Sequence, residues 1–239
     1  MAKRPVASSF NPATTVGLSL WLDAADASKF TYGTGTQVAS WIDKSPNVFT
    51  VSKSPTVNTV RSDTINGLSC ITTAHYQEQL TRASTPVRAL IDSVSFTDCM
   101  TFVVRQSVAT TQGGWMGLTT TNYRVSYDDR GAGAGYIDIA NSAGGRMISS
   151  LGSINGVTDL IAIYRSGSEM RAYRNGVQVA TKSGASGSIA AAESSTLCVL
   201  CPPAGGFVGK IGEIYHVSRY NATDFAAIQT YLNTKWAVY

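Results

Sequence analysis

Hydrophobic and polar residues alternate through most of this chain, which predicts β-strands. The alternation begins at residues 18–22, and residues 100–105 combine β-branched and aromatic side chains as buried strands do. Residues 160–180 are typical of successive strands joined by short turns, one of which falls at Asn175-Gly176. That dipeptide predicts a type I′ hairpin turn, in which both residues adopt φ > 0.

The C-terminal segment follows a helical period instead. Its large apolar residues recur at spacings that place them on one helix face: Phe225, Ile228, Leu232 and Trp236. We therefore expect an α-helix at about residues 223–236, capped by Asn221 or Thr223. Together the two patterns predict an all-β fold of two antiparallel sheets packed as a sandwich, with one C-terminal helix.

The first 17 residues show neither period and contain Pro5 and Pro12. We interpret residues 1–17 as an extended N-terminal arm that precedes a single domain at 18–239. Proline favours extended conformations, which lowers the entropy lost when a segment docks. The arm is expected to lie along a neighbouring subunit. Its predicted assembly contacts are Lys3 and Arg4, facing an acidic surface, and Phe10 as the apolar anchor.

Composition excludes several classes of partner. Only 14% of the residues are charged, the net charge is +4, and Lys3-Arg4 is the one adjacent basic pair, so a nucleic-acid-binding stripe is not expected. The chain has no apolar run of membrane-spanning length. Its N-terminus lacks the apolar core of a secretory signal. The four cysteines are expected to be buried free thiols. The pair in residues 198–201 is poorly placed to share a metal, because strand positions three apart face opposite sides and a zinc site needs four ligands.

Four phrases, in order, resemble the concanavalin A-like, laminin-G-like jelly-roll modules. They are LWLDAAD at residues 20–26, WIDKS at 41–45, GKIGEIY at 209–215 and YLNTKW at 231–236. Pro46 departs from the pattern, since glycine is usual there. The resemblance implies a concanavalin A-like jelly-roll sandwich. Modules of this kind occur in phage and viral structural proteins and in bacterial surface proteins.

A catalytic role finds no support in the sequence. Glycoside hydrolysis needs two carboxylates about 5–10 Å apart, and the glucanases of this superfamily carry them in an E-x-D-x-x-E run that is absent here. Glu213, within the strand phrase, is interpreted as structural. The two histidines, His75 and His216, lie near no nucleophile elbow. The chain is therefore expected not to be an enzyme.

Sugar-binding sites combine aromatic faces with nearby polar groups, and residues 115–136 contain both. The candidate carbohydrate-binding residues are Trp115, Tyr123, Tyr127, Asp128, Asp129, Arg130 and Tyr136. The alternative for the aromatic residues is packing in the core or at subunit contacts. Asp128 and Asp129 are also candidates for calcium, which prefers hard oxygen ligands; no other cofactor is expected. Asp23, Asp26 and Asp43 are expected to cap turns rather than to bind metal.

These observations lead to a functional hypothesis and an alternative. The hypothesis is a virion-associated structural protein with a lectin-like fold: a capsid decoration, head-fibre or tail component. Its expected partners are other virion or capsid proteins, reached through the arm, in a homo-oligomer or on a larger particle, with host or environmental glycans as further ligands. The alternative is a carbohydrate-binding module without catalytic activity, on an extracellular or cell-surface protein.

Overall fold

A computed structural model describes most of the chain. The described residues are 10–53, 60–74, 78–86, 89–90, 98–107, 113–118, 123–128, 135–139, 146–149, 156–185, 194–200 and 207–239; between 119 and 150 the description is of the backbone alone. The strands are β1 (Leu18–Asp23), β2 (Phe30–Tyr32), β3 (Val38–Ile42), β4 (Thr50–Lys53), β5 (Arg61–Ile65), β6 (Leu68–Thr73), β7 (Leu80–Pro86), β8 (Asp98–Ser107), β9 (Gly113–Leu118), β10 (Tyr123–Asp128), β11 (Gly135–Ile139), β12 (Arg146–Ser149), β13 (Thr158–Ser166), β14 (Glu169–Arg174), β15 (Val177–Lys182), β16 (Ser194–Val199) and β17 (Gly209–Val217). The helices are the 3-10 turns η1 (Pro12–Thr14) and η2 (Ala27–Lys29) and the α-helix α1 (Ala222–Trp236).

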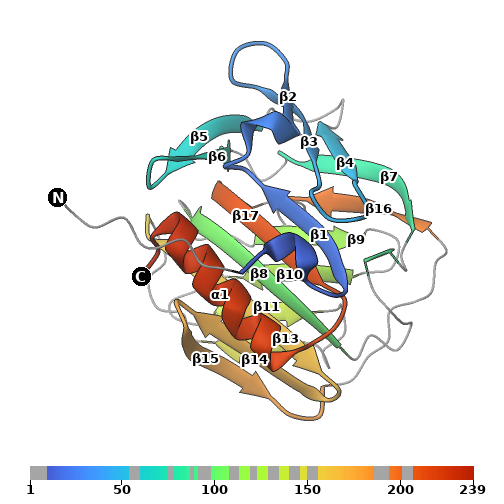
Figure 1. Cartoon of the computed structure of the whole chain (residues 1–239), viewed down its shortest axis with the longest axis vertical. Helices are drawn as coiled ribbons and strands as arrows, with labels where there is room; N and C mark the ends of the chain where they lie inside the picture. Colours follow the sequence, from blue (N-terminus) through green and yellow to red (C-terminus); the bar gives the residue numbers. More distant parts are fainter. Residues whose placement is uncertain are drawn as a thin grey trace.

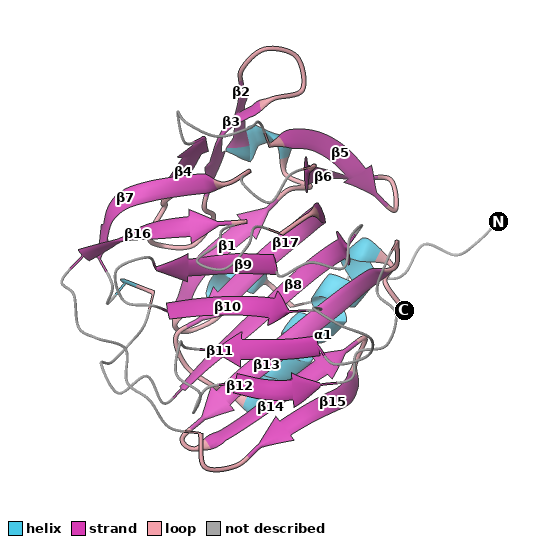
Figure 2. Cartoon of the chain, turned by 180° about the vertical axis from the view of Figure 1, so that it is seen from behind, coloured by secondary structure: helices cyan, strands magenta, loops and turns pink. Residues whose placement is uncertain are grey.

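These strands form two antiparallel sheets, as the alternation predicted. In the described residues the first sheet has the order β15-β14-β13-β8-β17-β6-β5, with β1 paired to β17 beside it. The second has the order β12-β11-β10-β9-β16-β7-β4-β3-β2. Helix α1 crosses the outer face of the first sheet (Figure 1), whereas the second sheet lies on the opposite side of the molecule from α1 (Figure 2).

Two apolar cores hold these three layers together. The first lies between the sheets and joins Val103 of β8 and Ile161 of β13 to Trp41 and Leu197 of the second sheet. The second lies between the first sheet and α1 and includes the neighbouring positions Phe102, Val104 and Leu160, with the four apolar helix residues predicted to share a face. Successive residues of β8 and β13 therefore face different cores, as strand geometry requires.

Two local predictions are confirmed in detail. Asn175 and Gly176 have φ values of 51° and 77°, as a type I′ turn requires. The Asn175 side chain also accepts a hydrogen bond from the Leu160 amide at 2.9 Å, which ties the turn to β13. Helix α1 is capped by Asn221, whose side-chain oxygen accepts from the Asp224 amide at 3.0 Å.

The N-terminal arm needs a correction. Residues 1–9, including Lys3 and Arg4, lie outside the described residues, but residues 10–17 pack against their own domain. The Phe10 ring lies 6.1 Å from the ring of Tyr231 in α1, and the Tyr215 hydroxyl donates to the Pro12 carbonyl at 2.5 Å. Phe10 is therefore partly buried within its own subunit, because the second core extends past α1 and accepts one more aromatic ring.

Candidate functional site

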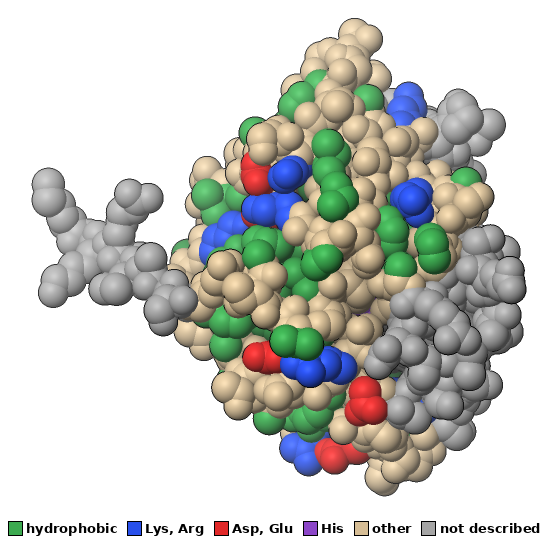
Figure 3. Space-filling view, turned by 45° about the vertical axis from the view of Figure 1, so that its right-hand side comes forward, with side chains coloured by type: hydrophobic (Ala, Val, Ile, Leu, Met, Phe, Trp, Pro, Cys, Tyr) green, Lys and Arg blue, Asp and Glu red, His purple; other side chains and the backbone are tan. Residues whose placement is uncertain are grey.

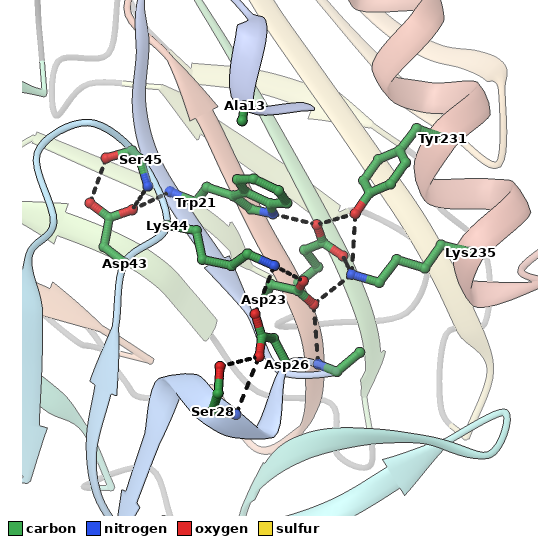
Figure 4. A network of polar contacts seen from close by, with 12 residues as sticks. Ala13, Trp21, Asp23, Asp26, Ser28, Asp43, Lys44, Ser45, Tyr231 and Lys235 are labelled. Atoms are coloured by element: carbon green, nitrogen blue, oxygen red, sulfur yellow. Dashed lines mark hydrogen bonds and ion pairs between the residues drawn. The ribbon is translucent and has the colours of Figure 1, made fainter. Parts of the chain in front are cut away.

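A network of polar side chains lies where β1, β17 and α1 meet (Figure 4). Lys235 of α1 places its ammonium 2.5 Å from Asp23 Oδ1 and 2.6 Å from Glu213 Oε2. Lys44, which follows β3, approaches the same Asp23 at 2.8 Å and Asp26 at 3.0 Å. We call these five residues, Asp23, Asp26, Lys44, Glu213 and Lys235, the junction cluster.

Glu213 is fully buried, yet hydrogen-bond donors surround its carboxylate. The Trp21 indole N–H donates to Oε1 at 2.6 Å and the Trp236 indole N–H donates to Oε2 at 2.8 Å. Burial raises the pKa of Glu213, while Lys235 and the Trp236 indole oppose that rise. A carboxylate engaged in this way is occupied within the fold. The cluster therefore acts as a structural clamp between helix and sheet, as the sequence interpretation of Glu213 proposed.

Asp43 organises the turn that follows β3. Its Oδ1 accepts from the backbone amides of Trp21 and Ser45, both at 2.8 Å, and its Oδ2 accepts from the Ser45 hydroxyl. Burial raises the pKa of Asp43, and the hydrogen bonds from Ser45 oppose the rise. The turn's left-handed residue is Val48, with φ 49°, so Pro46 does not have to adopt the glycine conformation usual in the resembling modules. The predicted turn-capping role of Asp43 is confirmed.

His216 of β17 is a buried, neutral histidine. Its Nε2–H donates to the Leu90 carbonyl at 3.1 Å, since a carbonyl can only accept, and its Nδ1 accepts from the Thr101 hydroxyl at 2.8 Å. Burial lowers the pKa of His216 from 6.5 to about 4. Both ring nitrogens serve the packing of strands, so the ring is structural.

A pH prediction follows from this histidine. Between pH 6.5 and 4 the unfolded chain binds a proton at His216 that the folded chain excludes, so stability falls as the pH falls. At pH 5 the loss relative to pH 8 is expected to be about 2 kcal/mol. Urea denaturation of the parent and of His216→Gln, whose amide can still donate to Leu90, should give a smaller pH-dependent loss in the variant. Equal losses in both proteins would contradict the prediction.

The sandwich interior holds a second charged group. Arg105 of β8 is fully buried, and its Nε lies 2.8 Å from Asp159 Oδ1, with Arg174 Nε 3.1 Å from Asp159 Oδ2. The Arg105 guanidinium also lies 5.2 Å from the centre of the Trp115 ring. Trp115 is therefore an inner-core residue. This corrects the prediction that it binds sugar, because an enclosed indole offers no face to a ligand at the surface.

For four of the remaining candidate sugar-binding residues, the structure describes the backbone but not the side chain. Tyr123, Tyr127 and Asp128 lie on β10 and Tyr136 on β11, where backbone pairing sets Asp128 opposite Tyr136. Asp129 and Arg130 lie outside the described residues. Within the described part of the chain, no group of three or more histidine, cysteine or acidic side chains is placed to hold a metal ion.

The prediction of buried free cysteine thiols is confirmed at two positions and is wrong at a third. Cys70 and Cys99 are buried free thiols. Cys198 is disulfide-bonded, which corrects the prediction of a free thiol. That prediction assumed a strand running through residues 198–201, whereas β16 ends at Val199 and Leu200 has a left-handed φ of 62°.

The outer face of the second sheet carries a feature that sequence patterns did not reveal. Phe30 stacks on Trp41 in the inner core at 5.2 Å, so the neighbouring pair Thr31 and Ser40 faces outward. The pairing then sets Ser40 opposite Ser52, and Ser52 opposite Thr81. The four strands β2, β3, β4 and β7 thus each contribute one hydroxyl to a line across the sheet. We call Thr31, Ser40, Ser52 and Thr81 the hydroxyl row.

Exposure differs along this row. Thr31 and Ser52 are exposed, Thr81 is half-buried, and Ser40 is buried with its hydroxyl 2.5 Å from that of Thr31. None of the described helices covers this face (Figure 2).

On the face seen in Figure 3, acidic and basic side chains are dispersed among uncharged groups, without a large patch of one sign. Among the described helices, none has the length and apolar character needed to cross a bilayer.

Comparisons with known proteins show the fold. No protein-family model matches the sequence, and no curated protein is significantly similar to it. The binding domain of Paraclostridial Mosquitocidal Protein 1 is similar in structure, with a TM-score of 0.59 and 12% identity over 91% of this chain and 53% of that one. An arabinofuranosidase complexed with arabinofuranosyl-alpha-1,2-xylobiose has a TM-score of 0.56 and 12% identity, over 95% of this chain and 60% of that one. Trypanosoma rangeli sialidase in complex with sialic acid has a TM-score of 0.53 and 10% identity, over 95% of this chain and 36% of that one. The chain spans less than two thirds of each of these structures, and what they share with it is the β-sandwich.

Proposed function

We propose that this chain is a glycan-binding β-sandwich domain without catalytic activity, and that it binds a neutral polysaccharide on the outer face of its second sheet. The observation that carries the proposal is the hydroxyl row. Helix α1 covers the outer face of the first sheet, whereas the second sheet presents small, uncharged hydroxyl side chains on β2, β4 and β7, with the buried Ser40 of β3 bonded to Thr31 between them.

The geometry of the row suits a polyhydroxylated ligand. Neighbouring strands lie about 4.8 Å apart, so Ser52 and Thr81 offer donors and acceptors on adjacent strands and Thr31 offers them two strands away, all along one line. Their short side chains lose little rotamer entropy when they are ordered by a ligand. A face of this kind favours an extended chain of sugars over a charged or strongly apolar partner.

The bonding of the buried carboxylates supports binding rather than hydrolysis. Two of the similar structures are carbohydrate-active enzymes by name, and this chain matches 60% and 36% of their lengths. In this chain Asp23 and Glu213 both bond to Lys235 within the junction cluster, which leaves neither carboxylate placed as a general acid.

Placing an arginine in the row tests the proposal. Ser52→Arg sets a long side chain across the exposed centre of the row and is expected to weaken polysaccharide binding at least tenfold, or about 1.4 kcal/mol. Affinity electrophoresis in gels containing soluble β-glucan or xylan measures the effect. Ala226→Arg is the matched control, because it adds the same charge on the exposed side of α1 and should bind as the parent does. Equal retardation of both variants would contradict the proposed face.

The virion-associated role remains a second proposal. It rests on the sequence of the arm, of which Lys3 and Arg4 lie outside the described residues, while Phe10 packs on its own domain. Deleting residues 2–9 would remove the basic pair and keep the described contacts of Phe10 and Pro12. If the arm mediates assembly, that deletion should abolish co-purification with particles or oligomers while binding to polysaccharide persists.

A further inference from the structure

A second, aromatic feature lies at the edge of the same sheet. The β2–β3 hairpin projects from the end of the molecule (Figure 1), and its strand β2 ends at Tyr32, whose side chain is 47% exposed. The residues that follow, 33–36, are all exposed, and the hairpin residues 30–37 include no charged side chain. Single exposed aromatic residues are common on protein surfaces, so the argument depends on how Tyr32 is held.

Tyr32 is the outermost of three consecutive aromatic rings. Its ring centre lies 6.0 Å from that of Phe30, and Phe30 stacks on the fully buried Trp41 at 5.2 Å with an interplanar angle of 22°. Trp41 belongs to the inner core. The exposed ring is therefore supported by a column of rings that reaches the centre of the sandwich.

The backbone of the hairpin is also fixed. The Gly33 amide donates to the Gln37 carbonyl at 2.9 Å, and Gly35 adopts φ +65°, which glycine tolerates without strain. The loop is joined to the region of β5, because the Val38 amide donates to the Val60 carbonyl and the Ser62 amide donates to the Thr36 carbonyl, both at 2.9 Å. A ligand that binds here meets a platform that is already ordered, which reduces the entropy lost on binding.

The surroundings of the ring fit a sugar. A tyrosine ring offers an apolar face together with a hydroxyl group, which matches a pyranose ring with one face of C–H groups and a rim of hydroxyls. Thr34, Thr36 and Gln37 supply uncharged donors and acceptors on the same loop. An isolated β-bridge pairs Gln37 with Arg61, and this pairing places one charged residue beside the loop.

We propose that Tyr32 is an aromatic stacking platform for a neutral pyranose unit, at the rim of the sandwich. The inference rests on the proposed glycan-binding function and adds a residue and a ligand class to it. β2 is the edge strand of the second sheet and also carries Thr31, the last member of the hydroxyl row. Side chains alternate along β2, so Tyr32 lies on the side of Phe30, opposite to Thr31, and a sugar on its ring binds at the rim of the sandwich rather than on the hydroxyl row itself.

Three substitutions at Tyr32 test the platform, in affinity electrophoresis with soluble β-glucan, xylan and, as the anionic probe, polygalacturonate. Tyr32→Ala should weaken binding to a neutral polysaccharide about tenfold, which corresponds to about 1.4 kcal/mol. Tyr32→Phe and Tyr32→Trp, which keep a ring, should stay close to the parent. Tyr239→Ala is the matched control, since that tyrosine is 54% exposed and lies at the far end of the chain.

The outcomes separate this inference from the proposed function. If Ser52→Arg loses binding but Tyr32→Ala does not, the glycan-binding face stands and the platform is overturned. A loss in Tyr32→Phe as large as in Tyr32→Ala would overturn stacking, because the ring would then contribute nothing. Retardation by polygalacturonate alone would overturn the neutral ligand class. If the parent binds none of the three polysaccharides, the proposed function fails and the platform fails with it.

Discussion

Replacing Lys235 by methionine is expected to destabilise the domain by about 3–5 kcal/mol at neutral pH, because the change leaves the buried Glu213 without its cation, while Asp23 keeps Lys44. Lys235 is bonded to both Asp23 and Glu213, whose side chains are almost completely buried. Methionine keeps most of the apolar stem, so the loss reports the charge rather than the packing. Urea denaturation followed by circular dichroism measures it.

The pH dependence of this variant supplies a second readout. Without Lys235, the pKa of Glu213, already raised by burial, should rise further. A carboxyl group whose folded pKa is raised loses stability as the pH rises through that pKa. The difference between parent and Lys235→Met should therefore grow as the pH rises above 4.5, the ordinary pKa of a glutamate.

A matched lysine provides the control. Lys210 also pairs with an aspartate, at 2.9 Å from Asp63, but both side chains are partly exposed. Lys210→Met is expected to cost less than about 1 kcal/mol, as exposed ion pairs do. Similar losses in the two variants would mean that the junction cluster is not the clamp that its burial indicates.

The parts of the fold that sequence predicts well are those that short-range rules decide. The hairpin at Asn175-Gly176 follows from the φ values that its turn demands, and the cap at Asn221 follows from the unpaired amides of a helix start. The β-branched and aromatic residues at 100–105 correctly indicated a buried strand, and β8 is buried on both faces, each in a different core. In each case the deciding partners lie within a few residues of one another.

The candidate site depended on long-range register and was therefore largely missed. The hydroxyl row needs the pairing of β2, β3, β4 and β7, which no local pattern supplies. Glu213 was interpreted correctly as structural, but its bond to Trp21 spans 192 residues of sequence and could not be foreseen. Trp115 was wrongly predicted to bind sugar. Its glycine neighbours suggested an exposed loop, whereas the strand pairing places its ring in the core beside Arg105.

Truncating Trp236 to alanine is the other change expected to be severe, with a loss of about 3–5 kcal/mol, the range for a buried large aromatic side chain. Trp236, predicted to lie on the apolar face of the helix, has no exposed surface, and its indole N–H donates to Glu213 at 2.8 Å. The alanine variant would leave both a cavity and a carboxylate with one donor fewer. Tyr239→Ala, at an exposed position three residues on, should change stability by less than about 0.5 kcal/mol.

Gly212 explains why the indole fits so closely and offers an independent check. A Cβ at this position of β17 would lie 2.8 Å from the Trp236 ring, closer than real contacts allow. Gly212→Ala should therefore displace the ring and destabilise the parent by about 1–3 kcal/mol, as overpacking does. In a Trp236→Ala background the same glycine substitution should cost much less, since the ring it would strike is gone. Additive losses in that double-mutant cycle, or a loss below about 1 kcal/mol for Trp236→Ala alone, would show that helix and sheet do not meet through this contact.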